Sequence, residues 1–337
     1  MFHKSLIDVH GFYAVWMVYL GKKTGLFGLI ASNKGPIAPS DLAKKSGLFA
    51  LGVEGWCSTA VCLGYLSEKN GRVSLSPEVR EVVLDEHSPY YAAGQFAYSA
   101  LRSLEYEAFD ELFASGKPKY PSSPKAIEAI EEATAWDHYS LLRSLIIKNK
   151  KIHALLSKGC KVLDVGCGVG KFMQRAKAVY PRSVFVGIDL YANEVTAAMR
   201  SKRKPTSRTE EKEHDIAILY NSAETMTFEE EYDVLYLGET LYLIDDKRKG
   251  LTNCYRALKK RGSIVILEGL RTDVDGCRIC EQDKTVMAMQ LDFVLQGHPF
   301  MRKKELMALL KETGFRNIKF SHLGASFFLV TADKPDL

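Results

Sequence analysis

A glycine-rich run directly after an apolar stretch offers the clearest chemistry in this chain. Residues 162–170 read Val-Leu-Asp-Val-Gly-Cys-Gly-Val-Gly. The apolar residues predict a buried strand with Asp164 near its end, and a helical segment follows the last glycine. Glycines let the backbone turn tightly and approach a ligand, and the start of a helix offers unpaired N–H groups. The pattern therefore predicts a nucleotide-binding loop that contains Gly166, Cys167, Gly168 and Gly170.

The spacing of these glycines indicates which nucleotide is bound. A dinucleotide site uses G-x-G-x-x-G to hold a pyrophosphate at the helix terminus. Here the third glycine comes one residue early, and Lys171 stands where that motif has its glycine. Asp164 would repel a pyrophosphate, but it can pair with the ammonium group of a methionine moiety. The spacing thus argues against a nicotinamide-dependent oxidoreductase.

An Asp-x-Gly-x-Gly-x-Gly run after a strand resembles the first motif of class I S-adenosylmethionine-dependent methyltransferases. The next apolar segment ends Val-Gly-Ile-Asp-Leu at residues 186–190. The resemblance implies that Asp189 accepts the ribose hydroxyls, with Leu190 beside it. It also implies that the segment Ser222, Ala223 and Glu224 borders the adenine, and that Gly238 ends the strand that leads to the catalytic region.

The N-terminal part has the pattern of a winged helix. Residues 39–47 predict a short helix in which Ser40 is the N-cap and Gly47 the left-handed stop. A second helix is expected at about 51–65, and residues 66–75 carry an Asn-Gly turn between short extended segments. That dipeptide favours a hairpin because both central residues of the turn need a positive φ.

Together with these segments, the resemblance extends to the dimerisation domain of caffeate-type and hydroxyindole-type O-methyltransferases. It implies a homodimer formed through the N-terminal domain. DNA binding is the weaker interpretation, because these helices lack the Lys and Arg density that phosphate contacts need. A winged-helix regulator that senses S-adenosylmethionine without catalysis stays open as a second hypothesis.

The second half alternates apolar runs with helical segments. Runs at 161–165, 184–188, 216–220, 233–237 and 263–267 predict buried parallel strands, and a helix at 304–315 precedes strand-like segments at 316–320 and 326–331. We expect an α/β fold with a doubly wound, Rossmann-like sheet of six or seven strands. The expected domains are a helical, winged-helix domain at 1–120, with linker helices to about 156, and a cofactor-binding domain at 157–337.

Methyl transfer to a hydroxyl requires alignment of the acceptor and removal of its proton. In the O-methyltransferases that this chain resembles, a histidine after the fourth strand is the base, and glutamates flank it. The matching stretch here, residues 238–246, contains no histidine. Glu268 matches one flanking glutamate, whereas the second flanking position is Phe300.

Either another residue removes the proton of the acceptor, or the reaction proceeds without a base. The candidates are His298 in a loop that lines the family's acceptor pocket, His138 on the linker helix, and Tyr242 and Glu239 by position. Tyr242 would need a lowered pKa to act as a base. A carbon, nitrogen or sulfur nucleophile would need less help than a hydroxyl. Each candidate also has an ordinary structural explanation, such as a turn histidine or a half-buried helix histidine.

Two segments have the composition of an apolar acceptor pocket. The Met and Phe side chains of 286–295, which match the family's substrate-lining helix, would form an adaptable wall. Aromatic residues of 90–113 could complete it. Packing of these helices in a core explains the same residues equally well.

The remaining composition is ordinary. A net charge of +5 over 337 residues leaves a nucleic-acid partner open without favouring one, and the basic residues 200–204 are followed by acids that cancel their field. No apolar run is long enough to cross a bilayer. Seven cysteines in a long chain predict reduced thiols and a cytoplasmic location. Cys277 and Cys280 form a lone C-x-x-C, too few ligands for a structural zinc site, so no metal is expected.

Overall fold

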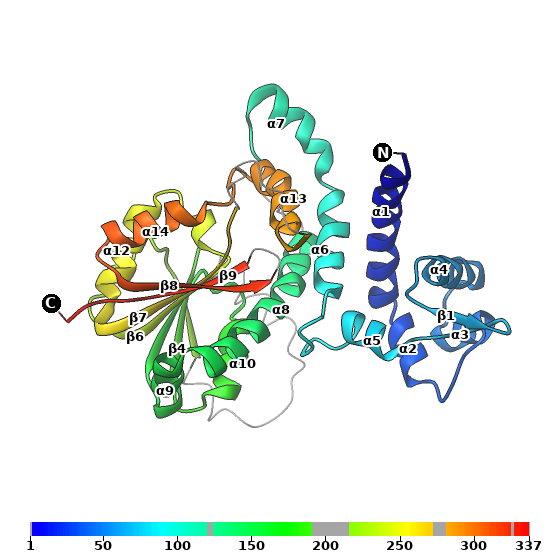
Figure 1. Ribbon diagram of the computed structural model, residues 1–337, viewed down its shortest axis with the longest axis horizontal. Helices are drawn as coiled ribbons and strands as arrows, with labels where there is room; N and C mark the ends of the chain where they lie inside the picture. Colours follow the sequence, from blue (N-terminus) through cyan, green and yellow to red (C-terminus); the bar gives the residue numbers. More distant parts are fainter. Residues whose placement is uncertain (1, 120–123, 191–215, 272–280, 325–326, 337) are drawn as a thin grey trace. The chain divides into compact units, whose positions relative to one another are not determined.

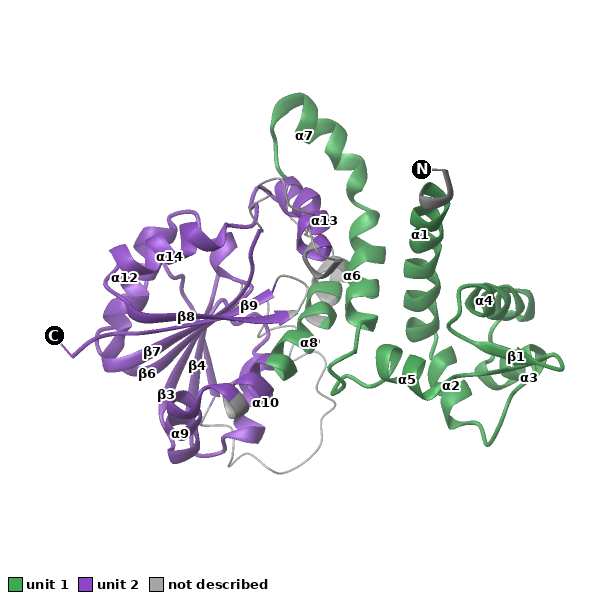
Figure 2. Ribbon diagram, viewed as in Figure 1, with its two compact units in different colours: residues 1–140 green, residues 141–337 purple. Residues whose placement is uncertain are grey.

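The computed structural model describes residues 2–119, 124–190, 216–271, 281–324 and 327–336. The chain divides into two compact units, residues 1–140 and 141–337 (Figure 2). The division falls inside one helix, Pro124–Lys148 (α8). Each unit is described by itself below.

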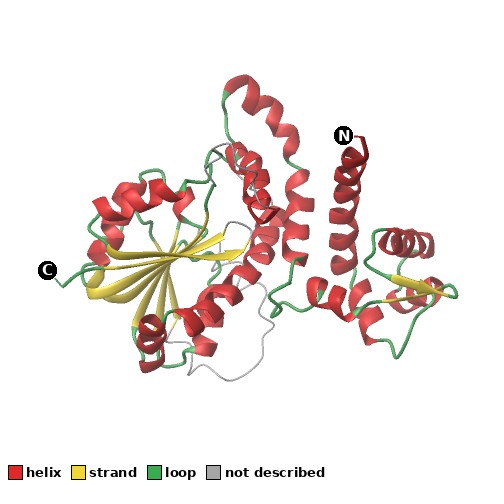
Figure 3. Cartoon of the chain, viewed as in Figure 1, coloured by secondary structure: helices red, strands yellow, loops and turns green. Residues whose placement is uncertain are grey.

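The first unit is almost entirely helical (Figures 1 and 3). In chain order its elements are α1 (Phe2–Lys23), α2 (Leu26–Ser32), α3 (Pro39–Ser46), α4 (Ala50–Cys62), β1 (Ser67–Lys69), β2 (Arg72–Ser74), α5 (Pro77–Val83), α6 (Ala93–Ser103), η1 (Tyr106–Ala108), α7 (Phe109–Ser115) and the first part of α8. The strands β1 and β2 form an antiparallel hairpin whose turn contains Asn70 and Gly71, with φ of 52° and 70°. The predicted Asn-Gly hairpin is confirmed.

One predicted helix cap is wrong. The N-cap of α3 is Ala38, in an extended conformation, and not Ser40. Pro39 follows at the first helical position, where its fixed φ suits a helix and its missing N–H costs nothing. The helix therefore begins before Ser40, which lies in the first turn. The predicted stop at Gly47 is confirmed by its φ of 67°.

The core of the first unit forms where its helices cross. Phe27 and Trp56 meet edge to face with ring centroids 5.0 Å apart, and the Trp56 indole donates to the Met17 carbonyl at 2.9 Å. Helices α6 and α8 approach very closely at Gly94, where a Cβ would lie 2.1 Å from the Glu132 carbonyl oxygen. Glycine is therefore required at that crossing.

The second unit is built on a seven-stranded sheet in the order β5-β4-β3-β6-β7-β9-β8. Its strands are β3 (Lys161–Val165), β4 (Val184–Asp189), β5 (Ile216–Tyr220), β6 (Tyr232–Gly238), β7 (Leu258–Gly269), β8 (Arg316–Gly324) and β9 (Phe327–Asp333). All neighbouring strands pair in parallel except β9, which is antiparallel to both β7 and β8. The predicted α/β class and the positions of the predicted strands are confirmed. The predicted burial is wrong for β5, whose residues are half-buried or exposed because it is an edge strand of the sheet.

The helical elements of this unit are α9 (Lys150–Lys158), α10 (Lys171–Val179), η2 (Leu241–Leu243), α12 (Lys247–Ala257), α13 (Glu281–Leu295) and α14 (Lys303–Glu312). Two apolar clusters cover the sheet, one including residues of α12 and α14 and the other residues of α9 and α10. The chain runs from β3 outward through β4 to β5, and then returns to β6 on the other side of β3. This reversal places the loops after β3 and β6 side by side at the carboxyl edge, where ligands bind in such sheets.

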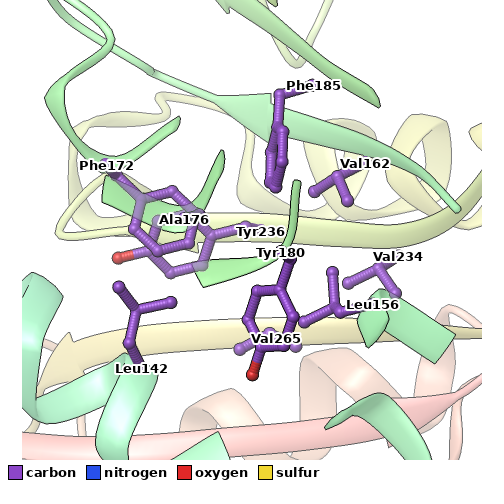
Figure 4. Close-up of a pocket in the computed structure, with 10 residues that line it drawn as sticks. All are labelled: Leu142, Leu156, Val162, Phe172, Ala176, Tyr180, Phe185, Val234, Tyr236 and Val265. Atoms are coloured by element: carbon purple, nitrogen blue, oxygen red, sulfur yellow. The ribbon is translucent and has the colours of Figure 1, made fainter. Parts of the chain in front are cut away.

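A small apolar void lies inside the cluster that contains α9 and α10 (Figure 4). It is lined by Leu142, Leu156, Val162, Phe172, Ala176, Tyr180, Phe185, Val234, Tyr236 and Val265. It is a packing defect of the core and lacks the convergent polar groups of a reactive site. Among the described residues, no helix combines the length and apolar character that a membrane crossing needs.

Candidate functional site

Asp164 lies near the end of β3, the strand that has β4 on one side and β6 on the other. Its Cα pairs with Gly187 of β4 and with Tyr236 of β6, and its side chain is 2% exposed. Its Oδ2 has no hydrogen-bond partner among the described residues. Burial, reinforced by the charge of Asp189, raises the pKa of Asp164 well above its usual range. A buried carboxylate oxygen without a donor is a binding point for a cationic group of a ligand.

The three glycines of the loop after β3 adopt left-handed backbone conformations. Gly166, Gly168 and Gly170 have φ of 75°, 51° and 74°, a region that side chains disfavour. Asp189 at the end of β4 holds the loop, because its Oδ2 accepts the Gly168 N–H at 3.0 Å. Gly170 is also the N-cap of α10, so the helix begins at the end of the loop.

Two glycines allow close approaches around the loop. A Cβ on Gly166 would lie 2.4 Å from Cγ2 of Thr240, so the loop touches the turn after β6. A Cβ on Gly187 would lie 2.5 Å from Sγ of Cys167, whose side chain therefore packs over β4. Burial, ahead of the nearby carboxylates, raises the pKa of Cys167. The thiol stays protonated and fills space in the loop.

The ends of β4 and β5 form the outer part of the site. Asp189 pairs in register with Tyr220, the last residue of β5. Leu190 and Tyr220 are 53% and 64% exposed. Tyr220 was not among the site residues predicted from the sequence. Its place at the end of the strand after the one carrying the acid could have indicated it.

The segment after β5 is tied to the beginning of α12. Ser222 Oγ lies 2.8 Å from Thr225 Oγ1, and the buried Ala223 accepts from Asn253 Nδ2 through its carbonyl at 2.9 Å. The Glu224 Oε1 accepts the Asp246 N–H at 3.0 Å. The three residues expected at the adenine thus lie on a fixed segment, with the carboxylate of Glu224 engaged by α12.

The turn after β6 contains a strained residue. Gly238 ends the strand, and Glu239 follows with φ of 52°, unusual for a side chain that lacks glycine's freedom. The Glu239 N–H donates to the Leu267 carbonyl of β7 at 2.8 Å. Strain of this kind is retained where surrounding structure enforces it, commonly at functional sites.

Glu268, near the end of β7, is fully buried behind this turn. Its Oε2 accepts the Leu241 N–H at 3.0 Å, and its Oε1 has no hydrogen-bond partner among the described residues. Burial raises the pKa of Glu268 to about 8, although the backbone of Leu241 and Tyr242 and the charge of Lys247 act in the opposite direction. Glu268 therefore holds the backbone that presents Tyr242.

Tyr242 belongs to an aromatic cluster with Phe293 and Phe300. Its ring meets Phe293 and Phe300 edge to face, with centroid distances of 4.8 and 5.9 Å, and the two phenylalanines stack at 3.9 Å. The Tyr242 side chain is only 8% exposed. Phe300, expected where the family has a second glutamate, is part of this apolar wall.

His298 follows α13 in a tight turn. Its backbone N–H donates to the Phe293 carbonyl at 2.9 Å, and its ring is half-buried. Burial and the charge of Lys247 lower the pKa of His298, whereas Asp245 and the Tyr242 carbonyl oppose this shift. The loop thus brings an imidazole to the same turn that carries Tyr242.

The remaining candidates lie elsewhere. His138 belongs to the part of α8 in the first unit. Cys277 and Cys280 and the basic residues 200–204 lie outside the described residues. Within the described part of the chain, no group of three or more His, Cys, Asp or Glu side chains could hold a metal ion.

The sequence of the chain is similar to that of known proteins. A family model described as a methyltransferase domain matches residues 135–319. The chain is 29% identical over 167 residues to the O-methyltransferase rstn1 of Aspergillus nomiae, which covers 49% of this chain and 68% of that protein.

Solved structures resemble the chain over its whole length. Human N-acetylserotonin methyltransferase, crystallised with S-adenosylmethionine, has a TM-score of 0.73 at 18% identity and covers 99% of this chain and 98% of its own. An O-methyltransferase family protein of Burkholderia thailandensis has a TM-score of 0.70 at 12% identity, with 99% and 98% covered. Identities this low establish the fold alone. Because the family model covers more than half of the chain, the chain belongs to the methyltransferase domain family and is an S-adenosylmethionine-dependent methyltransferase.

Proposed function

We propose that this enzyme transfers a methyl group from S-adenosylmethionine to a small, flat, apolar acceptor. The observation that carries the proposal is the buried Asp164 oxygen beneath the glycine loop, which fits the ammonium of a methionine moiety. Asp189 would accept the ribose hydroxyls. The adenine would lie among Leu190, Tyr220 and the 222–224 segment. The cofactor supplies a methyl carbon already activated by its sulfonium, so the protein has to align the acceptor and manage its proton.

The aromatic cluster suits a planar acceptor. Tyr242 follows shortly after Thr240, the residue that approaches Gly166 of the glycine loop. The aromatic cluster and the proposed cofactor site are therefore neighbours in the same unit. Oxygen is the favoured acceptor atom, because relatives of this chain from two Aspergillus species are described as O-methyltransferases. Carbon, nitrogen and sulfur acceptors are the alternatives.

We propose His298 as the base. Its lowered pKa favours the neutral imidazole, the form that accepts a proton. Tyr242 has its ring packed in the aromatic cluster, and an ordinary phenol is protonated at neutral pH, so it has no phenolate oxygen to accept a proton. Glu268 is engaged with the backbone of the turn. Glu239 stays a candidate by position, as does His138.

The first unit supports a homodimer. Helices α3 and α4 followed by the β1–β2 hairpin have the element order of a winged helix. Helix α1 exposes Leu6, Ile7, Val9, Phe12, Tyr13 and Leu20 to between 41% and 58%. Contiguous exposed apolar side chains indicate an interaction surface, and a second copy of the chain is the proposed occupant. We found no observation that favours the regulator hypothesis.

We also propose that the enzyme acts in the cytoplasm. The five described cysteines are all free, and Cys57 and Cys254 are buried. Unpaired thiols suit a reducing compartment. Cell fractionation with an antibody against the native chain tests this location.

Binding and turnover test the proposed function separately. S-adenosylhomocysteine should raise the melting temperature of the purified chain, whereas NAD should not. A panel of phenols, hydroxyindoles, amines and thiols should then identify acceptors through acceptor-dependent release of S-adenosylhomocysteine. With a hydroxyl acceptor, His298→Gln should lower kcat by about 10²- to 10⁴-fold. Protection by NAD alone would overturn the proposal.

A further inference from the structure

Arg271 follows strand β7 at its carboxyl end and is half-buried. Its backbone N–H donates to the Met301 carbonyl at 2.8 Å, and a parallel bridge joins it to Arg302. The backbone of Arg271 is therefore fixed beside the segment that carries Phe300. The Nε of its guanidinium is buried and has no hydrogen-bond partner among the described residues.

Alternation along β7 places Arg271 on the same side as the aromatic cluster. Odd-numbered residues of the strand face the apolar cluster that contains residues of α9 and α10, as Leu267 does. A Cβ on Gly269 would lie 2.8 Å from Cε1 of Phe300, so this aromatic ring covers the odd-numbered face where β7 ends. Arg271 comes two residues later, and residues two apart in an extended segment share a face. The guanidinium therefore belongs to the edge of the aromatic cluster.

The carboxylates on the neighbouring elements are used by other groups. Glu268 lies on the even-numbered face of β7 and holds the turn η2. Glu305 caps α14 by accepting the Arg302 N–H at 2.9 Å, and Asp292 on α13 accepts from the side chain four residues on at 3.2 Å. Within the described part of the chain, Arg271 forms no ion pair. The fold thus supplies a cation at this edge without a counter-ion.

A guanidinium in this position fits a carboxylate. A buried N–H of a charged group without an acceptor carries a desolvation cost that an incoming acceptor can offset. Arginine presents its donors in a planar fork that matches the two oxygens of a carboxylate, and the pair is stronger where water is excluded. The stacked rings of Phe293 and Phe300 beside it suit a flat molecule. An aromatic acid combines the two features that this edge of the cluster recognises.

We propose that Arg271 binds a carboxylate of the methyl acceptor, so that the acceptor is a flat aromatic acid whose remaining surface is apolar. The inference rests on the proposed function, in which the aromatic cluster contacts the acceptor. Arg271 is a specificity-determining residue, because it contacts the substrate away from the methylated atom. It takes no part in the transfer of the proton or of the methyl group.

The first test needs no ligand. Arg271→Met removes the charge and keeps the aliphatic length, and Arg271→Gln is a second uncharged variant. Removal of a cation that has no counter-ion relieves a desolvation cost, so these variants should melt no earlier than the wild type. The matched control is Arg261→Met, at the other end of β7, which removes an exposed arginine paired with Asp336. A lower melting temperature in both Arg271 variants would show that the guanidinium pairs within the chain, and would overturn the inference.

The second test compares aromatic acids with their amides. The probes are 4-hydroxybenzoate, 4-hydroxycinnamate and 6-hydroxy-2-naphthoate, each beside its uncharged primary amide of nearly the same shape. Calorimetry at neutral pH measures their binding to the full chain, with and without S-adenosylhomocysteine. At least one acid should bind the wild type about tenfold to a hundredfold more tightly than its amide, and more so at low salt. Arg271→Met should abolish this preference, Arg271→Lys should keep part of it, and Arg261→Met should keep all of it.

The inference is wrong if no acid binds more tightly than its amide, or if the preference survives in Arg271→Met. Binding of S-adenosylhomocysteine to the same samples separates the two proposals. A wild type that binds S-adenosylhomocysteine without preferring acids loses only this inference, whereas one that does not bind it loses the proposed function. Once turnover is measured, Arg271→Met should raise KM for the acid about tenfold to a hundredfold with little change in kcat, because the carboxylate is held equally before and during methyl transfer. A fall in kcat alone would contradict a role in acceptor binding.

Discussion

At the scale of single residues, two aspartates that end neighbouring strands have different tasks. Asp189 is half-buried and is used by the protein itself, because it accepts the Gly168 N–H. Asp164 is buried, and its Oδ2 receives no donor from the described residues. A buried acceptor that the fold does not satisfy carries a desolvation cost, which a cationic ligand group can offset. Asp164 is therefore the residue on which cofactor affinity should depend most strongly.

Asp164→Asn should weaken binding of S-adenosylmethionine by roughly tenfold to a hundredfold, the effect of losing one charged hydrogen bond of about 1.5–3 kcal/mol. Calorimetry below about pH 7.5, where an α-amino group stays protonated, measures this. Because the pKa of Asp164 is raised in the free protein, the wild type should also release protons on binding. Asp336→Asn removes only an exposed pairing with Arg261 and should bind normally. Equal affinities of the two variants would contradict the assignment.

Glu268 should make stability depend on pH. Its pKa rises from an ordinary value of 4.5 to about 8 on folding. The folded chain therefore binds the proton more tightly than the unfolded chain, and the stabilisation present below about pH 4.5 is lost as pH rises through 8.

Denaturant unfolding at several pH values should show a smaller loss of stability between about pH 5 and 8 in Glu268→Gln, by up to about a few kcal/mol. Some slope should persist, because burial also raises the pKa values of Asp137 and Asp164. Glu231→Gln, on an exposed strand end, is the control and should follow the wild type. A slope in Glu268→Gln as steep as in the wild type would refute the assignment.

At the scale of elements, the sequence predicted what local patterns encode. Strands buried on both faces are continuous apolar runs, which is why β3, β6 and β7 were found. The edge strand β5 was found from its apolar run as well, although none of its residues is buried. Ser40 was wrongly chosen as a cap because Pro39 begins the helix first. The hydrogen bond from the Leu241 N–H to Glu268 Oε2 could not be predicted, since it joins residues 27 positions apart in sequence. Contacts between residues far apart in sequence depend on where the turns end, and residue types alone do not specify that.

The glycine loop should tolerate substitution unequally. Gly166→Ala combines a φ of 75° with a Cβ only 2.4 Å from the Thr240 side chain, so the turn after β6 has to shift. Gly168→Ala has the φ penalty alone, because no atom of the described residues beyond its chain neighbours lies within 4 Å of an added Cβ. We expect Gly166→Ala to cost about 2–4 kcal/mol of stability and most of the cofactor affinity, and Gly168→Ala about 1–2 kcal/mol. Thermal unfolding with and without S-adenosylhomocysteine checks the ranking, and the reverse order would contradict it.

At the scale of the whole molecule, sequence and structure identify relatives over different lengths. The family model matches residues 135–319, whereas solved structures match 98–99% of the chain. The second unit carries the proposed cofactor site, which would depend on particular residues such as Asp164 and the loop glycines. A helical unit needs mainly an apolar pattern, which many sequences satisfy. The likeness of the N-terminal half to other proteins is therefore detected in its fold and much less in its sequence.

The proposed homodimer can be tested by substitutions on helix α1. Phe12 and Tyr13 are 54% and 58% exposed, and burying two such side chains contributes about 1.5–3 kcal/mol each. The wild type should be a dimer at micromolar concentration in sedimentation experiments. The double variant Phe12→Glu and Tyr13→Glu should be monomeric with an unchanged melting temperature of the second unit, because buried carboxylates would oppose association. Val179→Glu, at an apolar position on α10 that is 43% exposed, is the control and should stay dimeric. A dimer that survives the double variant would place the interface elsewhere, and a monomeric wild type would exclude it.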